Sequence, residues 1–204
     1  MHKHRSHWTT SLVALGAACL VSLPRPAHAG GIEPPVVPTD LVVSSDHRPY
    51  LVAHAIGTQN YVCAPKGDGF AWKSYGPQAT LFDDHGHQIA THFLSPNPDE
   101  QGKYRPTWQH SRDTSAVWAN PVAETTDPVY VETGAISWLK LEIVGRTRGV
   151  DGRRLTETTF IQRVNTVGGI APATGCSAAA HLGERALVPY ETDYVFYKAR
   201  GRQG

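Results

Sequence analysis

The clearest pattern along the chain is an alternation of apolar and polar residues with period two. In Ile136–Thr147, the sequence WLKLEI places leucine or isoleucine at every second position, with charged residues between them. Such alternation is typical of a strand with one buried face. A second segment, Leu155–Asn165, follows after Asp151-Gly152, a pair that is common in tight turns. We predict that the two segments form a β-hairpin.

Further short apolar segments recur between glycines and prolines. The best helix candidate, Cys176–Gly183, has two turns at most. Many strands at short intervals with little helix indicate an all-β fold. We predict a single antiparallel β-sandwich or barrel-like domain. The other predicted strands are Tyr50–Gly57, Gln59–Cys63, Gly69–Tyr75, two arms within Ala79–Phe93, Tyr104–His110, Ala116–Glu124 and Asp193–Lys198.

The N-terminal residues have the three parts of a secretory signal peptide. Lys3 and Arg5 precede an apolar run, Thr9–Leu23, and the sequence AHAG follows. We expect residues 1–29 to be a signal peptide that is cleaved after Ala29. The apolar run is shorter than the roughly 20 residues of a membrane-spanning helix. The sequence therefore predicts a secreted or periplasmic protein with no transmembrane anchor after cleavage.

Residues 30–48 differ from the rest of the chain because they are rich in proline. Proline removes a backbone donor and is excluded from helix interiors and central strands. We expect an extended arm or linker here, with a short strand at 41–45. The β domain itself is predicted to cover residues 49–200.

The charge balance excludes one class of partner. The whole sequence holds 19 basic and 18 acidic residues. The predicted leader contains Lys3, Arg5 and Arg25 and no acidic residue, so that 16 basic and 18 acidic side chains remain. A chain so close to neutral has no strong field for a polyanion. We therefore expect no nucleic-acid partner.

Two of the three cysteines, Cys63 and Cys176, lie beyond the predicted leader. Two cysteines in an oxidising compartment usually pair. We predict a Cys63–Cys176 disulfide that closes a loop of more than a hundred residues. A reactive thiol or a metal pair is the alternative, but the chain has no CxxC spacing that favours it.

Six segments follow one another along the chain in the order of a known family. They are GTQNYVC (57–63), ATLFD (79–83), PTW (106–108), WLKL (138–141), FIQRVNTVGGIAPATGC (160–176) and VPYETDYVFYK (188–198). Together they resemble the family DUF3455, secreted proteins of bacteria and fungi without an established reaction. The resemblance implies a secreted, β-rich domain. The segment around PTW departs from the family pattern, which has a glycine-histidine motif before it. Some members carry a malate dehydrogenase label, but this chain lacks the strand, glycine-rich turn and helix of a dinucleotide site.

Histidines and aspartates gather in the sequence DDHGHQIATH. His85 and His87 are two residues apart, so on a strand they project from one face, and Asp83 lies close by. These residue types can bind a metal ion. His92 has the opposite parity to His87, and we expect it to point away. The alternative is a solvated hairpin tip, because histidine and aspartate are ordinary turn residues.

Aromatic residues give a second candidate site. Trp72, Tyr75 and Trp108 have polar or proline-rich neighbours. Exposed aromatic rings of this kind can stack on a sugar or a peptide. Packing in the core is the alternative for each, and we favour it for Trp138.

A third candidate is the polar end of a predicted strand. Arg163 and Asn165, with Gly168 and Gly169, could form a backbone nest for an anion. Alternatively the two glycines let the chain turn sharply at an architectural corner, which Arg163 and Asn165 brace.

No serine-hydrolase elbow, zinc-protease motif or phosphate-binding loop occurs, so no catalytic residue can be named. The interpretation that the sequence favours is a non-catalytic protein without a cofactor that binds a glycan or an envelope or surface partner. One alternative is a metal-dependent enzyme that uses the His85/His87 region. Another is a purely structural surface protein.

Overall fold

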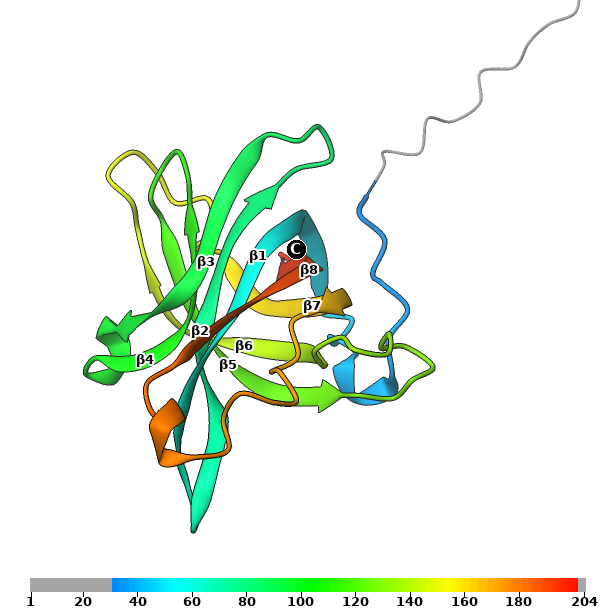
Figure 1. Cartoon of the computed structure of the whole chain (residues 1–204). Coiled ribbons are helices and arrows are strands. Elements are labelled where there is room, and N and C mark those ends of the chain that lie inside the picture. Colours follow the sequence, from blue (N-terminus) through cyan, green and yellow to red (C-terminus); the bar gives the residue numbers. More distant parts are fainter. Residues whose placement is uncertain (1–30, 202–204) are drawn as a thin grey trace, which may run out of the picture. The chain divides into compact units, whose positions relative to one another are not determined.

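The computed structural model describes residues 31–201 and contains eight antiparallel strands that close into one barrel (Figure 1). This confirms the all-β prediction and selects a barrel. The predicted signal peptide lies outside the described residues. The strands are β1 (His47–Lys66), β2 (Gly69–Phe82), β3 (Gln88–Asn97), β4 (Lys103–His110), β5 (Ala116–Thr125), β6 (Trp138–Thr147), β7 (Thr158–Gly168) and β8 (Arg185–Ala199).

The strand order follows the chain, so each strand pairs with the next one. Both predicted hairpins are present, β2 with β3 and β6 with β7. The barrel closes where β1 pairs with β8, from His47↔Ala199 to Val62↔Arg185. β1 and β2 continue past the barrel as a long hairpin that ends at the Lys66↔Gly69 pair. Closure leaves no sheet edge, and it gives every strand an inner and an outer face.

The barrel interior forms the main core. Aromatic side chains from β4 and β8 pack there with leucine and isoleucine from β6 and β7. Alanines occupy the inner positions of β1, β2 and β3, and their small side chains leave room for the large rings. The alternation predicted for β6 is confirmed, because Leu139, Leu141 and Ile143 are buried and Glu142 is exposed. The main members are Ala53, Ala55, Ala79, Ala90, Trp108, Leu141, Ile161, Tyr190, Tyr194 and Phe196.

A second core lies outside the barrel, beneath the proline-rich segment. Leu41 is 1% exposed and packs in one cluster with Trp138 and Tyr197. The Gln162 amide nitrogen donates to the Leu41 carbonyl oxygen at 2.7 Å. In turn, the Tyr197 hydroxyl donates to Gln162 Oε1 at 2.6 Å. The segment before β1 is therefore a docked cover for the outer face of the sheet.

Two local predictions are wrong. Residues 41–45 form no strand, because the backbone folds into a 3-10 turn, η1 (Thr39–Leu41), where Leu41 N donates to Pro38 O. The helix candidate Cys176–Gly183 contains one turn, η3 (Ala179–His181), and no regular helix. A third short turn, η2 (Pro98–Glu100), connects β3 to β4.

Cys63 and Cys176 form the predicted disulfide, with a Cα–Cα distance of 5.4 Å. Cys63 lies on β1, near the point where the hairpin leaves the barrel, and Cys176 lies in the connection between β7 and β8. Backbone bonds at the same place join Cys63 to Gly183 and Glu184. The bridge therefore ties the last connection of the barrel to its first strand.

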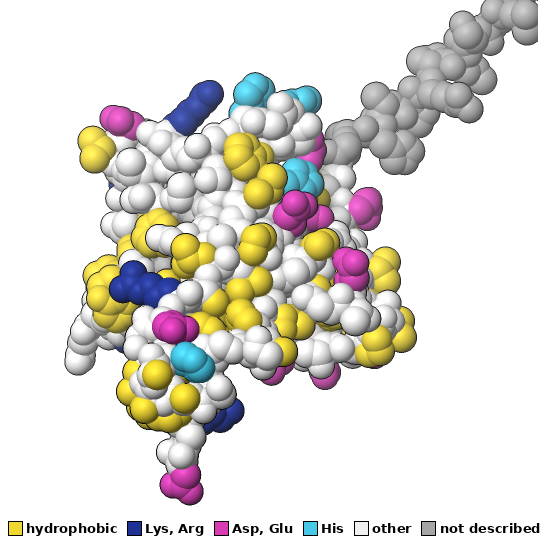
Figure 2. Space-filling view, viewed as in Figure 1, with side chains coloured by type: hydrophobic (Ala, Val, Ile, Leu, Met, Phe, Trp, Pro, Cys, Tyr) yellow, Lys and Arg dark blue, Asp and Glu magenta, His cyan; other side chains and the backbone are white. Residues whose placement is uncertain are grey.

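The surface shows no concentrated charge on the face drawn in Figure 2, where the lysine and arginine side chains stand apart from one another. None of the helical segments within residues 31–201 is both long and apolar enough to cross a membrane.

Candidate functional site

The barrel interior is incompletely filled at the end from which the β1–β2 hairpin extends. A cavity of about 210 Å³ lies there. Its wall includes the fully buried Trp108 and also Tyr75, which is 38% exposed, so the cavity reaches solvent. An eight-stranded barrel is wide enough either to be packed solid or to hold one small ligand. The lining residues are Gln59, Ser74, Tyr75, Gly76, Pro77, His92, Leu94, Pro106, Trp108, Leu139, Leu141, Arg163 and Tyr194.

His92 and Trp108 form the inner wall of this cavity. The register of β3 and β4 pairs them directly, and both side chains point into the barrel. Their rings stack with centroids 4.0 Å apart and an angle of 13° between the planes. His92 was expected to point away from the side of His87 and was not a candidate for any site. The structure shows that this direction is the inside of the barrel.

The protonation state of His92 is fixed by its surroundings. Burial lowers the pKa of its imidazole from 6.5 to about 3, although a bond to the Thr107 carbonyl oxygen opposes this. His92 is therefore neutral at ordinary pH, and its Nδ1–H donates to Thr107 O at 2.8 Å. Nε2 then remains an acceptor, and it has no hydrogen-bond partner among the described residues.

Tyr194, on β8, completes the aromatic wall, and its neighbour Tyr190 lies next to it in the core. The Tyr194 ring meets the Trp108 ring edge to face, with centroids 5.3 Å apart. Its hydroxyl lies 3.4 Å from the Tyr190 hydroxyl. Burial raises the pKa of both phenols, so both stay protonated. They can therefore donate or accept a hydrogen bond, but they carry no charge.

Arg163, on β7, supplies the charge of the cavity. Its Nε and Nη2 atoms donate to the Ser137 carbonyl oxygen at 3.0 and 2.7 Å. Within residues 31–201, no carboxylate lies within ion-pair distance of its guanidinium group. The Trp108 indole N–H is also buried without an acceptor in this part of the chain. The site thus combines apolar and aromatic walls with one cationic side chain, an arrangement typical of small-molecule sites.

The three aromatic residues predicted to stack on a ligand separate into two groups. Tyr75 and Trp108 both line the cavity. Trp72 does not, because its indole N–H donates to the Thr174 carbonyl oxygen near the disulfide, at 2.9 Å. Trp108 is wholly buried rather than exposed. A flat stacking platform on the surface is therefore not formed by these three residues.

Arg163 and Asn165, the polar residues predicted to share one site at the end of a strand, lie on opposite faces of β7. Arg163 faces the cavity, whereas Asn165 is exposed and donates to Asp193 Oδ2 at 2.8 Å. Asn165 has a φ of 52°, at an irregularity in the β7–β8 register. This bulge reverses the alternation after Arg163. The two residues therefore do not form one anion-binding nest.

Asp83, His85 and His87 lie at the tip of the β2–β3 hairpin. Asp83 Oδ1 accepts from the backbone amides of His85 and His87, at 2.9 Å each. These bonds, the one from His87 first, lower the pKa of the Asp83 carboxyl. Within residues 31–201, no three His, Cys, Asp or Glu side chains are grouped as a metal site. The metal role of these residues stays a prediction, and their observed contacts are those of a turn.

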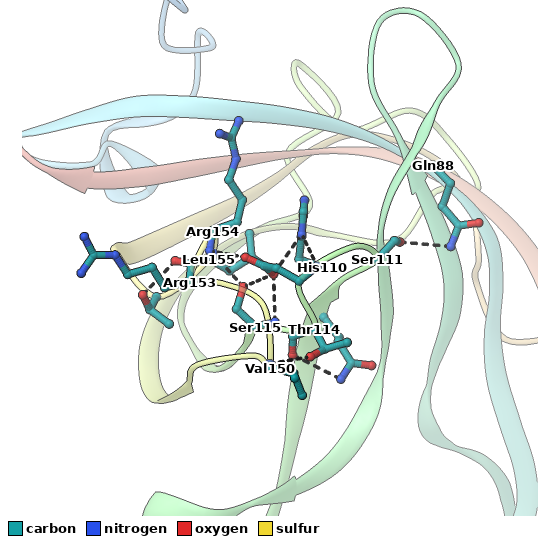
Figure 3. A network of polar contacts seen from close by, with 12 residues as sticks. Gln88, His110, Ser111, Thr114, Ser115, Val150, Arg153, Arg154 and Leu155 are labelled. Atoms are coloured by element: carbon teal, nitrogen blue, oxygen red, sulfur yellow. Dashed lines mark hydrogen bonds and ion pairs between the residues drawn. The ribbon is translucent and has the colours of Figure 1, made fainter.

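A second cavity, of about 310 Å³, lies at the opposite end of the barrel and is lined partly by Asp83 and His87. Next to it, Asp113 joins the β4–β5 turn to the β6–β7 loop, because it accepts from the Ser115 hydroxyl and the Arg154 amide. Figure 3 shows the polar network at this place, with His110, Ser115 and Arg154 labelled. Burial opposes ionisation of Asp113, but bonds from the Arg154 amide and from Ser115 outweigh it and lower the pKa to about 2. The carboxylate is therefore occupied in holding two loops together.

The fold and the first cavity define a class of protein: an antiparallel eight-stranded barrel with a cavity of about 210 Å³ inside it. The chain belongs to the family described as protein of unknown function (DUF3455), whose model matches residues 44–198. The resemblance seen in the sequence is thereby confirmed. No curated protein and no solved structure shows significant similarity to the chain.

Proposed function

We propose that this protein is a non-catalytic binding protein that holds one small molecule inside its barrel. The observation that carries the proposal is the open cavity of about 210 Å³ that reaches the core residues Trp108, Leu141 and Tyr194 inside the barrel. Packed cores contain few voids larger than a water molecule.

The volume of the cavity bears on the kind of ligand. It is below the roughly 300–1,000 Å³ of sites that take drug-sized molecules. A small molecule with one ring fits such a space better than the glycan that the sequence suggested. Catalysis is not part of the proposal, because a pKa of about 3 makes the His92 imidazole a weak base and its Nδ1 is committed to the Thr107 backbone.

Export is part of the proposal. The Cys63–Cys176 disulfide is compatible with a secreted or periplasmic protein, since such bonds form and persist in oxidising compartments. The predicted leader at residues 1–29 supports the same location.

Filling the cavity with a larger side chain should weaken binding. We expect indole and p-cresol to bind the wild type, as detected by ligand-observed NMR. The variant Leu94→Trp should bind them at least about tenfold more weakly, which corresponds to a loss of about 1.4 kcal/mol of binding free energy. Leu94 is half-buried on the cavity wall, so that a larger ring there occupies the space.

Leu187→Trp is the matched control, because Leu187 is 57% exposed and does not line the cavity. It should bind as the wild type does. Equal binding by Leu94→Trp and wild type would place the ligand elsewhere. Binding of maltose but of neither aromatic probe would favour the glycan interpretation over this proposal.

A further inference from the structure

We propose that the ligand is a small organic monoanion, of the carboxylate class, and that Arg163 binds its negative group. This inference rests on the proposed function, because it assigns a chemical class to the molecule in the same cavity. Its physical basis is a cation on the cavity wall that the described part of the protein does not neutralise.

The guanidinium group of Arg163 is held in one orientation. Two of its donors converge on the Ser137 carbonyl oxygen, and Nη2 also lies 3.3 Å from Ser137 Oγ. The guanidinium also lies within hydrogen-bond reach of the Tyr194 hydroxyl, which is an uncharged partner. A guanidinium presents its donors in a rigid plane that suits the two oxygens of a carboxylate. Arg163 is therefore preorganised, with donors left for a ligand.

The cost of the unpaired charge supports an anionic ligand. Arg163 is half-buried, and the cavity that it lines is walled by Leu139, Leu141 and Trp108. A charge that is partly removed from water is stabilised by an opposite charge, and buried charges are normally paired. No aspartate or glutamate occurs among the described residues that line the cavity. An anion from solution can supply the missing charge.

The other polar groups limit the ligand to a single negative charge. His92 is neutral and both buried tyrosines are protonated, so Arg163 is the one full charge among the lining residues described. A dianion would bring a second charge into an apolar space without a partner for it.

The apolar wall favours an organic anion over an inorganic one. Leu94, Pro106 and Leu139 offer no hydrogen bonds to the outer oxygens of a phosphate ion. They can instead contact a ring or a short carbon chain, and the stacked Trp108 and His92 rings add aromatic contacts. Inorganic phosphate shares the negative charge but lacks this apolar body, so it serves as one arm of the test.

The test compares benzoate with nitrobenzene, a neutral molecule of nearly the same shape, and with inorganic phosphate. Each is titrated by NMR into the wild type, Arg163→Gln and Arg146→Gln. Arg146 is an exposed arginine that also donates to a backbone carbonyl, that of Thr156. Arg146→Gln therefore removes one positive charge, as Arg163→Gln does, but at a position outside the cavity. In Arg163→Gln, the new side-chain amide keeps a donor near Ser137, which limits the structural damage.

We expect the wild type and Arg146→Gln to bind benzoate at least about tenfold more tightly than nitrobenzene, the range of a hydrogen bond to a charged group. Arg163→Gln should lose this preference and still bind nitrobenzene. Arg163→Lys, which keeps the charge without the planar donors, should retain part of it. Phosphate should bind more weakly than benzoate.

Two results would overturn the inference while leaving the proposed function intact. One is equal binding of nitrobenzene and benzoate by the wild type, a comparison that needs no folded variant. The other is an unchanged preference in Arg163→Gln. Phosphate binding tighter than benzoate would replace the organic anion with an inorganic one. A wild type that binds none of the aromatic probes would contradict the proposed function itself.

Discussion

Replacing both Cys63 and Cys176 by alanine is expected to lower the free energy of unfolding by roughly 4 to 5 kcal/mol. The bridge joins residues 113 positions apart, so its removal lets the unfolded chain explore many more conformations. The loop that it closes holds β2 to β7 entirely. Urea unfolding, followed by tryptophan fluorescence, measures the difference between oxidised wild type and the double variant.

Reduced wild type is the control for this prediction. If the crosslink itself stabilises the fold, reduced wild type and the alanine variant should unfold at the same urea concentration. A loss below about 1 kcal/mol in both would contradict the prediction, because a loop of this length should give several times that. It would also mean that the backbone bonds from Cys63 to Gly183 and Glu184 hold the connection without the crosslink.

Acid is expected to destabilise the protein through His92. Its folded pKa of about 3 lies far below 6.5, so the unfolded chain binds one more proton between these values. The stabilisation is fully present above pH 6.5 and is lost as the pH falls towards 3. The slope is about 1.4 kcal/mol per pH unit for one proton. Between about pH 6 and 4.5, the free energy of unfolding should fall by roughly 2 kcal/mol.

The variant His92→Gln isolates this effect, because glutamine does not titrate and its amide can still donate near Thr107 O. We expect the free energy of unfolding to depend less steeply on pH in the variant. The slope should be smaller by about 1.4 kcal/mol per pH unit, the contribution of one proton. His54 acts in the opposite direction, since Asp84 and Asp193 raise its pKa, but its contribution is the same in both proteins. Parallel pH profiles would show that His92 is accessible to protons in the folded state.

The fold could be predicted from the sequence where the pattern is local. The alternation in β6 and the turn at the β2–β3 tip are properties of neighbouring residues, and both hairpins formed as expected. The choice between sandwich and barrel depends on β1 meeting β8, a contact between the two ends of the domain that no local pattern encodes. The docking of Leu41 on the outer face is non-local in the same way.

The candidate site was only partly predictable for the same reason. Trp108, Tyr75 and Arg163 were singled out by residue type, and all three line the cavity. Their spatial relation was not visible, because they come from β4, β2 and β7. The sequence did contain a signal for His92, since its parity sets it apart from His87. The parity alone did not show that His92 points into the barrel, because the inner face of β3 is defined by the closure of the barrel.

Binding inside the barrel can be tested by titrating ¹⁵N-labelled protein with benzoate and observing the indole N–H signals. Trp108 and Trp138 both have buried N–H groups without partners among the described residues, but Trp138 lies in the outer core. We expect the Trp108 signal to move to saturation while the Trp138 signal stays in place. A Trp108 signal that does not move, or equal movement of both signals, would contradict binding inside the barrel.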